Sequence, residues 1–245
     1  VVGEKQVLTH ADDKAWYIKG FRVGRGEALA VALPQTLLQL WQTLQVCVAH
    51  DAIVLMQASN TGVTGGSTPD GNDYDRDIVI ISTRQLKGVQ VIDQARQVIA
   101  FPSTTLTELE QTLQPLGREP HSVIGSSCIG ASVVGGICNN SGGSLIRRGP
   151  AFTEKSLFAR IHPDGRLEMV NHLGIELGDT PEAMLKNLAE QQYQTGNQPD
   201  WQGKIWADDY ADRLRDITAS SPARFNGDVR YLHDSSGSAG KVVVF

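Results

Sequence analysis

Two stretches of small, uncharged residues are the parts of this sequence best suited to bind a ligand. The first runs from Gln57 to Ser67 and reads QASNTGVTGGS. Glycines permit positive φ angles, which let successive backbone N–H groups point toward one place. The hydroxyl and amide side chains add hydrogen-bonding groups without charge. This first loop is therefore suited to hold a diphosphate by its backbone, and the alternative is a mobile polar loop without a ligand.

The second stretch, from Val123 to Gly143, mixes small residues with apolar ones and contains no charged residue. A solvated linker would be more polar and would carry charge. We therefore expect this second loop to be buried against a flat ligand with a polar tail. Asn139, Asn140 and Ser141 can pair with groups that such burial would leave unsatisfied. The alternative is a short helix packed closely against a sheet.

Other ligand-binding motifs are absent from the sequence. It has no GxGxxG, no GxxxxGK[ST] and no GxSxG. The aspartates from Asp73 to Asp77 alternate as in a calcium loop, but Ile78 replaces the required glycine and Arg84 the required glutamate. We expect a solvated loop that leads into a strand. The histidines lack metal-binding spacing, so we expect no metal site and a structural role for His121.

The composition is that of an ordinary globular protein. Of 245 residues, 40% are hydrophobic and 20% are charged, with a net charge of -5. This charge argues against attraction to nucleic acid or to anionic lipid, and no apolar run approaches the ~20 residues of a membrane-spanning helix. Cys47, Cys128 and Cys138 form no CxxC pair, which indicates free thiols. Because the chain starts at Val1 and ends within an apolar strand pattern, we expect it to be a fragment of a longer protein.

The segments around the first loop predict a small α/β unit. Ala28–Leu33 reads as a strand, and Pro34 suits the first turn of the helix that follows. Further strands are expected at Ile53–Met56 and Asp77–Ser82, and the second has the continuous apolar run of a sheet covered on both faces. Strand–helix–strand order predicts parallel strands. The apolar face of the helix contains Leu37, Leu40, Trp41, Leu44, Cys47 and Val48.

The rest of the chain predicts a different arrangement, and we place the boundary between residues 86 and 87. A strand at Gln97–Phe101 precedes a helix that starts with a Thr105/Glu108 capping box. The apolar face of that helix contains Leu106, Leu109, Leu113 and Leu116. Strands at 156–161 and 166–170 flank the turn His162–Gly165, which predicts a β-hairpin. From 178 to 224 the sequence predicts no definite structure.

Two loops of this kind, in this order, resemble the FAD-binding domain of the vanillyl-alcohol-oxidase-type (PCMH) flavoproteins. The first loop is similar to the family's pyrophosphate loop, and Ile129–Gly143 is similar to its second glycine-rich segment. Three further strings resemble the quinone-dependent bacterial members that oxidise D-lactate. They are Gly71–Asp77, Gly117–Cys128 and Ser235–Lys241. The resemblance covers nearly the whole chain.

The resemblance implies an α+β fold with two subdomains, a small α/β subdomain at 1–86 and a mainly antiparallel sheet with helices at 87–245. FAD would lie between them. Some members attach flavin covalently through a histidine of the first loop, but Thr61 stands near that place, so noncovalent FAD is implied. The matching FAD-contacting positions are Ala58, Ser59, Asn60, Thr61, Gly62, Gly66, Ser67, Gly125, Ser132, Gly142 and Val244.

The resemblance also implies an activity for the whole protein. It would oxidise D-lactate by hydride transfer to flavin and pass the electrons to membrane quinone, as a peripheral protein on the cytoplasmic side of the cell membrane. There are two alternatives to this activity. The substrate could be another D-2-hydroxy acid, or the protein could be a non-catalytic FAD- or nucleotide-binding module. In the family, much of the substrate pocket and the membrane-contacting surface lie C-terminal to this segment, so contact with the membrane is expected through regions outside this chain. We therefore assign no catalytic base and expect little turnover from this chain alone.

Overall fold

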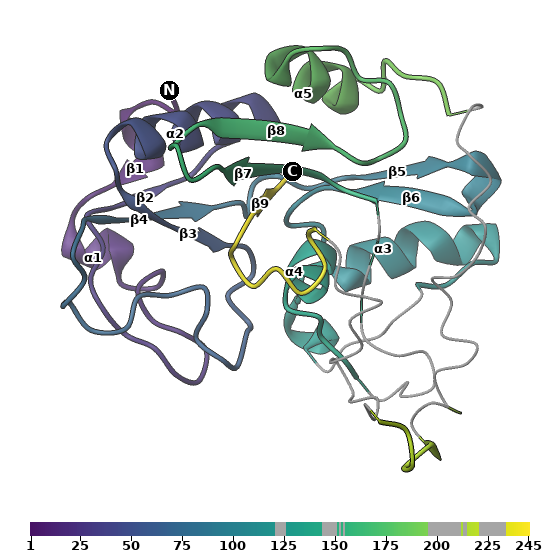
Figure 1. The fold of residues 1–245 in the computed structure, drawn as a ribbon, viewed down its shortest axis with the longest axis horizontal. Coiled ribbons are helices and arrows are strands. Elements are labelled where there is room, and N and C mark those ends of the chain that lie inside the picture. Colours follow the sequence, from purple (N-terminus) through teal and green to yellow (C-terminus); the bar gives the residue numbers. More distant parts are fainter. Residues whose placement is uncertain are drawn as a thin grey trace.

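The computed structural model describes residues 1–120, 126–143, 151, 153, 155–195, 212, 215–220 and 234–245. The described strands form a four-stranded sheet, a hairpin and a three-stranded sheet, with helices packed beside them (Figure 1). The four-stranded sheet contains β1 (Val7–Leu8), β2 (Ala30–Ala32), β3 (Ile53–Gln57) and β4 (Ile78–Ser82). The hairpin contains β5 (Val89–Ile92) and β6 (Gln97–Ala100). The three-stranded sheet contains β7 (Leu157–Ile161), β8 (Leu167–Asn171) and β9 (Val243–Val244).

The four-stranded sheet confirms the predicted α/β unit. Its strand order is β1-β2-β4-β3, in which β4 pairs in parallel with both β2 and β3. On one face, Ile78 and Ile80 pack with Val31 in a small core. On the other face, Ile81 belongs to the main core. The apolar run of β4 is thus explained by burial on both faces, whereas the antiparallel edge strand β1 was not predicted.

Helix α2 (Leu37–Ala49) covers the main-core face of this sheet. Its predicted apolar face is confirmed, because Leu40, Trp41 and Leu44 are each at most 3% exposed. The prediction for Pro34 was wrong. Thr36 is the N-cap, since its hydroxyl accepts the N–H of Gln39 at 3.1 Å, and the helix begins only after it. Pro34 therefore lies in the preceding turn.

Helix α3 (Leu106–Leu113) begins with the predicted capping box. Leu109 and Leu113 are buried, but Leu116 is 48% exposed. The α-helix gives way to the 3-10 turn η3 (Gln114–Leu116), with a proline at its start. The change of pitch rotates Leu116 off the buried face, so its predicted burial was wrong.

The three-stranded sheet contains the last strand of the chain. The predicted hairpin β7–β8 is confirmed, and β9 pairs antiparallel with the other edge of β7. Phe245 then packs edge-on against Trp41 of α2, with ring centroids 6.4 Å apart. The Trp41 indole N–H also donates to the Glu182 carboxylate at 3.1 Å. Glu182 lies at the start of α5 (Pro181–Ala189). This helix falls in the stretch for which the sequence predicted no definite structure.

One main core therefore contains residues from both sides of the expected boundary between residues 86 and 87, and that division stays a prediction. The three cysteines are free thiols, as expected. Among the described residues, no helix has the length and hydrophobicity to cross a bilayer. The same residues contain no cluster of three or more side chains suited to hold a metal.

Candidate functional site

The first loop leaves the carboxyl end of β3, which is the edge of a parallel sheet where ligands commonly bind. Gln57, the last residue of β3, is 1% exposed. Its side-chain amide donates to the carbonyl oxygens of Tyr17 and Ser67, each at 2.9 Å. These two bonds hold together both ends of the loop and the segment after α1 (Ala11–Lys14).

Asn60 shapes the middle of the first loop. It adopts a φ of 53°, in the left-handed region that asparagine tolerates better than most residues. Its Nδ2 donates to the carbonyl oxygen of Lys19 at 2.8 Å, and its Oδ1 accepts the hydroxyl of Ser67 at 3.2 Å. These two bonds connect the middle of the first loop to Lys19 and to the end of the loop at Ser67.

The backbone of the first loop offers donors and space. Within the described part of the chain, no backbone N–H from Ser59 to Ser67 donates to a protein acceptor. A Cβ atom placed on Gly62 or Gly66 would meet no atom within 4 Å. The Ser82 hydroxyl, at the end of β4, is buried and has no partner among the described residues. Unpaired donors around open space fit the diphosphate of a dinucleotide.

A second segment, the Lys19–Arg25 loop, packs directly on the first loop. A Cβ on Gly20 would lie 2.0 Å from the carbonyl oxygen of Val23, and one on Gly24 would lie 2.6 Å from the Thr68 hydroxyl. Only glycine permits this close approach. This loop was not predicted from the sequence. The three closely spaced glycines of KGFRVGRG, Gly20, Gly24 and Gly26, were a usable signal for it.

The second loop is not a loop throughout. Among the described residues it contains the 3-10 turn η4 (Ser127–Ile129) and the short helix α4 (Val133–Cys138). The short helix is the element that the alternative named. The Ser132 hydroxyl accepts the N–H of Gly135 at 3.1 Å and caps α4. A Cβ on Gly135 would lie 2.6 Å from that hydroxyl oxygen, which explains the glycine at this position.

The C-terminal end of α4 is held by the Ser235–Lys241 string. The N–H groups of Gly237 and Ala239 donate to the carbonyl oxygens of Ile137 and Cys138, at 3.0 and 2.9 Å. Burial raises the pKa of the Cys138 thiol to about 11. The string leads directly into β9 and thereby connects α4 to the three-stranded sheet.

A pocket of about 350 Å³ brings the two loops together. One wall comes from the first loop and another from Ile129 of the second loop. Of the described residues that line it, only Lys19 is titratable, so the pocket can bind a ligand but supplies no carboxylate or imidazole for proton transfer. The lining residues are Trp16, Lys19, Gly20, Phe21, Ser59, Asn60, Thr61 and Ile129.

The predicted site residues fall into three groups. Ser59, Asn60 and Thr61 line this pocket, and Ala58, Gly62, Gly66 and Ser67 belong to the same loop without lining it. Ser132 caps α4, Gly142 follows that helix, and Val244 lies in β9, where it pairs with Phe158. Gly125 and His121 lie outside the described residues.

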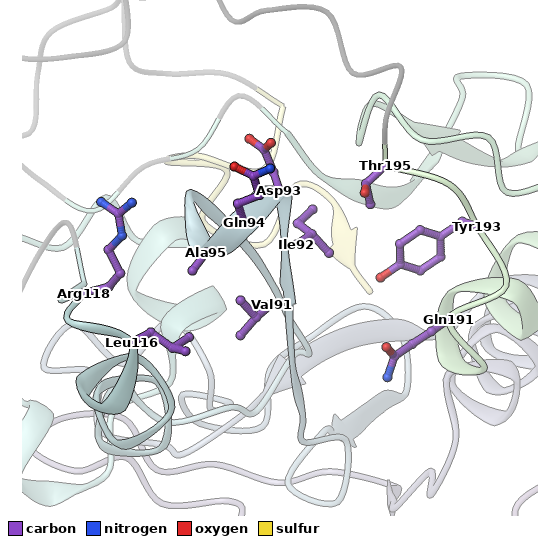
Figure 2. Close-up of a pocket in the computed structure, with 10 residues that line it drawn as sticks. All are labelled: Val91, Ile92, Asp93, Gln94, Ala95, Leu116, Arg118, Gln191, Tyr193 and Thr195. Carbon is purple, nitrogen blue, oxygen red and sulfur yellow. The ribbon is translucent and has the colours of Figure 1, made fainter.

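A larger cavity of about 690 Å³ lies over the hairpin β5–β6, around its turn Asp93–Ala95. Figure 2 shows Leu116 and Arg118 on one side of β5 and Tyr193 on the other. None of the residues that line this cavity comes from the first or second loop. We therefore assign the candidate ligand site to the smaller pocket, where both loops contribute.

Comparison with known families identifies the cofactor of this domain. Residues 28–154, just over half of the chain, match the family described as FAD binding domain. The chain belongs to the FAD binding domain family. The range covers the first loop and the second loop in full, and FAD is the cofactor predicted from the sequence. The backbone donors and open space of the first loop fit the diphosphate of FAD.

Curated relatives align with this chain, a member of the FAD binding domain family, over its whole length. Quinone-dependent D-lactate dehydrogenase from Escherichia coli (strain K12) is 58% identical over 245 residues. The protein of the same description from Haemophilus influenzae is 54% identical. In each case the match covers 100% of this chain and 43% of the relative. The chain thus spans less than half the length of the curated relatives it matches.

Solved structures identify the fold of the FAD binding domain. Alkyldihydroxyacetonephosphate synthase aligns with a TM-score of 0.56 at 14% identity, over 74% of this chain and 35% of that chain. p-Cresol methylhydroxylase aligns with a TM-score of 0.52 at 16% identity, over 75% of this chain and 38% of that one. The fold is therefore the α+β PCMH-type FAD-binding fold, as the sequence predicted.

Proposed function

We propose that this chain holds FAD noncovalently, with the diphosphate on the first loop and part of the cofactor in the pocket between the two loops. The structural observation that supports this is the row of N–H groups from Ser59 to Ser67, which have no acceptor among the residues that the structure describes. Thr61 lines the pocket and has no group that would attach flavin covalently. The proposed FAD-binding residues are Ala58, Ser59, Asn60, Thr61, Gly62, Gly66, Ser67, Gly125, Ser132, Gly142 and Val244.

In this proposal the residues act in different ways. The first loop binds through backbone N–H groups, because it carries no charged side chain. Ser132 acts by holding the start of α4 in place, since its hydroxyl is engaged as the helix cap. Val244 acts through β9, which follows the string that pins the other end of α4. FAD, when bound, supplies the redox chemistry.

We further propose that the whole protein oxidises D-lactate to pyruvate and transfers the electrons to quinone, as a peripheral protein on the cytoplasmic face of the cell membrane. The observation that carries this proposal is 58% identity, over every residue of this chain, to a quinone-dependent D-lactate dehydrogenase. Such identity extends well beyond the two glycine-rich loops. In this reading, residues 1–86 and 87–245 are the two FAD-binding subdomains.

FAD binding is tested by titrating the 245-residue chain with FAD and following the quenching of flavin fluorescence. Gly62→Val and Gly66→Val are the decisive variants, because an added Cβ atom at either position would meet no atom within 4 Å and neither glycine has a positive φ. Both variants should fold normally and bind FAD at least about tenfold more weakly, a loss of ~1.4 kcal/mol. Thr64→Val, in the same loop but outside the proposed contacts, should bind like the unchanged chain. Full FAD affinity in both glycine variants would contradict the proposed site.

The activity is tested on the protein in its full natural length. Anaerobic D-lactate should bleach the visible absorption of bound FAD, and added quinone should restore it. Faster bleaching by glycolate or D-2-hydroxyglutarate would assign the other substrate class. The second candidate, a non-catalytic FAD-binding module, is favoured by the single titratable side chain, Lys19, among the described residues that line the pocket. Absence of bleaching by all three acids would support it.

A further inference from the structure

The Ser235–Lys241 string is tied to the three-stranded sheet at both of its ends. After the string, β9 pairs with β7, where Val244 lies opposite Phe158. Before the string, a carboxylate oxygen of Asp234 lies 2.6 Å from Nδ1 of His172, the residue that directly follows β8. Figure 1 shows this segment in yellow, passing beside α4 before it reaches β9. The contact between His172 and Asp234 therefore fixes the end of the string that no strand holds.

Two contacts with β7 and its flank hold the imidazole of His172 in place. The backbone N–H of His172 donates to the carbonyl oxygen of Ser156 at 2.9 Å, which continues the pairing of β7 with β8. The ring lies edge-on to the ring of Phe158, with centroids 5.7 Å apart, and Phe158 is 1% exposed. Because a carboxylate only accepts hydrogen bonds, the Nδ1–H group donates to Asp234.

Asp234 depends on such a partner. It adopts a φ of 28°, in the region that residues other than glycine rarely occupy. Backbone of this kind persists only where the surrounding structure holds it. The residues after it are buried, and the Ser236 hydroxyl accepts the N–H of Thr153 at 2.8 Å and donates to its carbonyl oxygen at 2.7 Å. The start of the string is thus a strained, buried segment held by side-chain hydrogen bonds.

The string in turn determines where α4 lies. Its two backbone bonds to the carbonyl oxygens of Ile137 and Cys138 hold the end of that helix. Helix α4 lies in the second loop, between Ile129, which lines the smaller pocket, and Gly142, a proposed FAD contact. A shift of the string would therefore displace the part of the cofactor site that the second loop contributes.

We propose that His172 is a positioning residue for the cofactor, because its bond to Asp234 holds the string against α4. Without this bond the string leaves α4 in a fraction of the molecules, and the apparent FAD affinity falls by that fraction. His172 belongs to neither loop and is not among the described residues that line the smaller pocket, so it acts through the string. The inference rests on the proposed function, since it concerns the same FAD site.

The test measures two properties of the 245-residue chain, its FAD affinity and the rate at which iodoacetamide labels Cys138 before FAD is added. The thiol of Cys138 is buried and its carbonyl group is bonded to the string. His172→Ala should weaken FAD binding roughly fivefold and speed the labelling of Cys138 about tenfold through local opening. His172→Asn should restore both values, because the asparagine amide nitrogen can take the place of Nδ1. Unchanged FAD affinity in His172→Ala would overturn the proposal.

The other two cysteines are internal controls for the labelling. Cys47 is 5% exposed in the main core, so its thiol reacts when the whole chain unfolds. Cys128 is exposed and should react at the same rate in every variant. Mass spectrometry of the labelled peptides separates the three sites. Equal acceleration at Cys47 and Cys138 in His172→Ala would show a general loss of stability and overturn the positioning role.

The matched control is the second imidazole–carboxylate pair of the same hairpin. Nε2 of His162 lies 2.7 Å from a carboxylate oxygen of Glu168, at the end of the hairpin opposite to His172. His162→Ala breaks a bond of the same kind and should leave both FAD affinity and the labelling of Cys138 unchanged. Equal effects of His162→Ala and His172→Ala would overturn the proposal.

A double variant tests whether His172 and Asp234 act as a pair. Asp234→Gly removes the carboxylate and tolerates the positive φ. The combination of His172→Ala with Asp234→Gly should weaken FAD binding no more than either change alone, because both remove the same bond. Losses that simply add would overturn the pairing.

FAD titration of the unchanged chain separates this inference from the proposed function. No FAD binding by the unchanged chain would overturn the proposed function and the inference with it. Normal FAD binding by both the unchanged chain and His172→Ala would overturn only the role of His172.

Discussion

The side-chain amide of Asn60 donates to the carbonyl oxygen of Lys19 over 2.8 Å and joins two segments that are 41 residues apart in the sequence. Asn60 also adopts a φ of 53°. A single residue therefore sets the backbone of the first loop and attaches it to the Lys19–Arg25 loop. Because Asn60 lines the pocket as well, this bond contributes to the shape of that pocket.

Replacing Asn60 separates its two roles. Asn60→Gly keeps the left-handed backbone but loses the bonds to Lys19 and Ser67, and we expect FAD affinity to fall about tenfold, or ~1.4 kcal/mol. Asn60→Ala loses the same bonds and adds backbone strain of about 1–2 kcal/mol, so its stability and its FAD affinity should fall further. Calorimetric titration with FAD and urea denaturation measure the two effects. Unchanged FAD affinity in Asn60→Gly would show that the amide does not shape the site.

Gln57 should matter for both stability and binding. Gln57→Leu leaves the carbonyl oxygens of Tyr17 and Ser67 without their donor, at a cost of at most about 1–3 kcal/mol each, because both bonds are only part-buried. The released loop should also bind FAD more weakly. Gln90→Leu is the matched control, because Gln90 is also buried and its amide donates to the carbonyl oxygen of Leu188. Urea denaturation should show a similar loss in both variants, with FAD affinity reduced in Gln57→Leu alone.

Local patterns account for the parts of the fold that the sequence predicted. The apolar run of β4, the helical spacing in α2 and the capping box of α3 each involve neighbours within a few residues. Strand β5 was missed because its alternation includes a buried polar residue, Gln90, whose partners Leu188 and Tyr193 lie about 100 residues away. Helix α5 was missed within a polar stretch, although Thr180 and Pro181 are suitable cap and first-turn residues.

The candidate site also has parts that local sequence predicts and parts that depend on contacts between distant residues. Both glycine-rich loops could be predicted, because their lack of charge is visible in the sequence. The Lys19–Arg25 loop could not be placed beside them, since its position depends on contacts of Gln57 and Asn60 with distant carbonyl groups. Helix α4 was underestimated because Gly135 and Gly136 are poor helix formers. The cap from Ser132, whose hydroxyl accepts the N–H of Gly135 at 3.1 Å, favours the helix at this place.

Ser132 offers a test of indirect positioning. Ser132→Ala removes the cap of α4 and should lower the free energy of unfolding by about 1 kcal/mol, with weaker FAD binding as a consequence. Ser132→Thr should restore both, because threonine can accept the same bond from Gly135. Thr180→Ala removes the equivalent cap of α5, where Thr180 accepts the N–H of Ala183 at 3.2 Å. It should reduce stability by a similar amount and leave FAD binding unchanged. Loss of FAD affinity in Ser132→Thr would instead indicate direct contact of the serine with the cofactor.

The raised pKa of the Cys138 thiol predicts that the folded protein loses stability at alkaline pH. Burial raises its pKa from 9.0 to about 11, so between these values the folded chain holds a proton that the unfolded chain has released. Stability is therefore full below pH 9 and falls as the pH rises toward 11, by about 2 kcal/mol for a shift of this size. Urea denaturation of the unchanged chain and of Cys138→Ala across this range measures the effect, because subtracting the two curves removes the contribution of other titrating groups. The variant should show the shallower decline. Parallel curves would mean that the thiol ionises as readily in the folded protein as in the unfolded one, and that the contacts between α4 and the Ser235–Lys241 string leave it open to water.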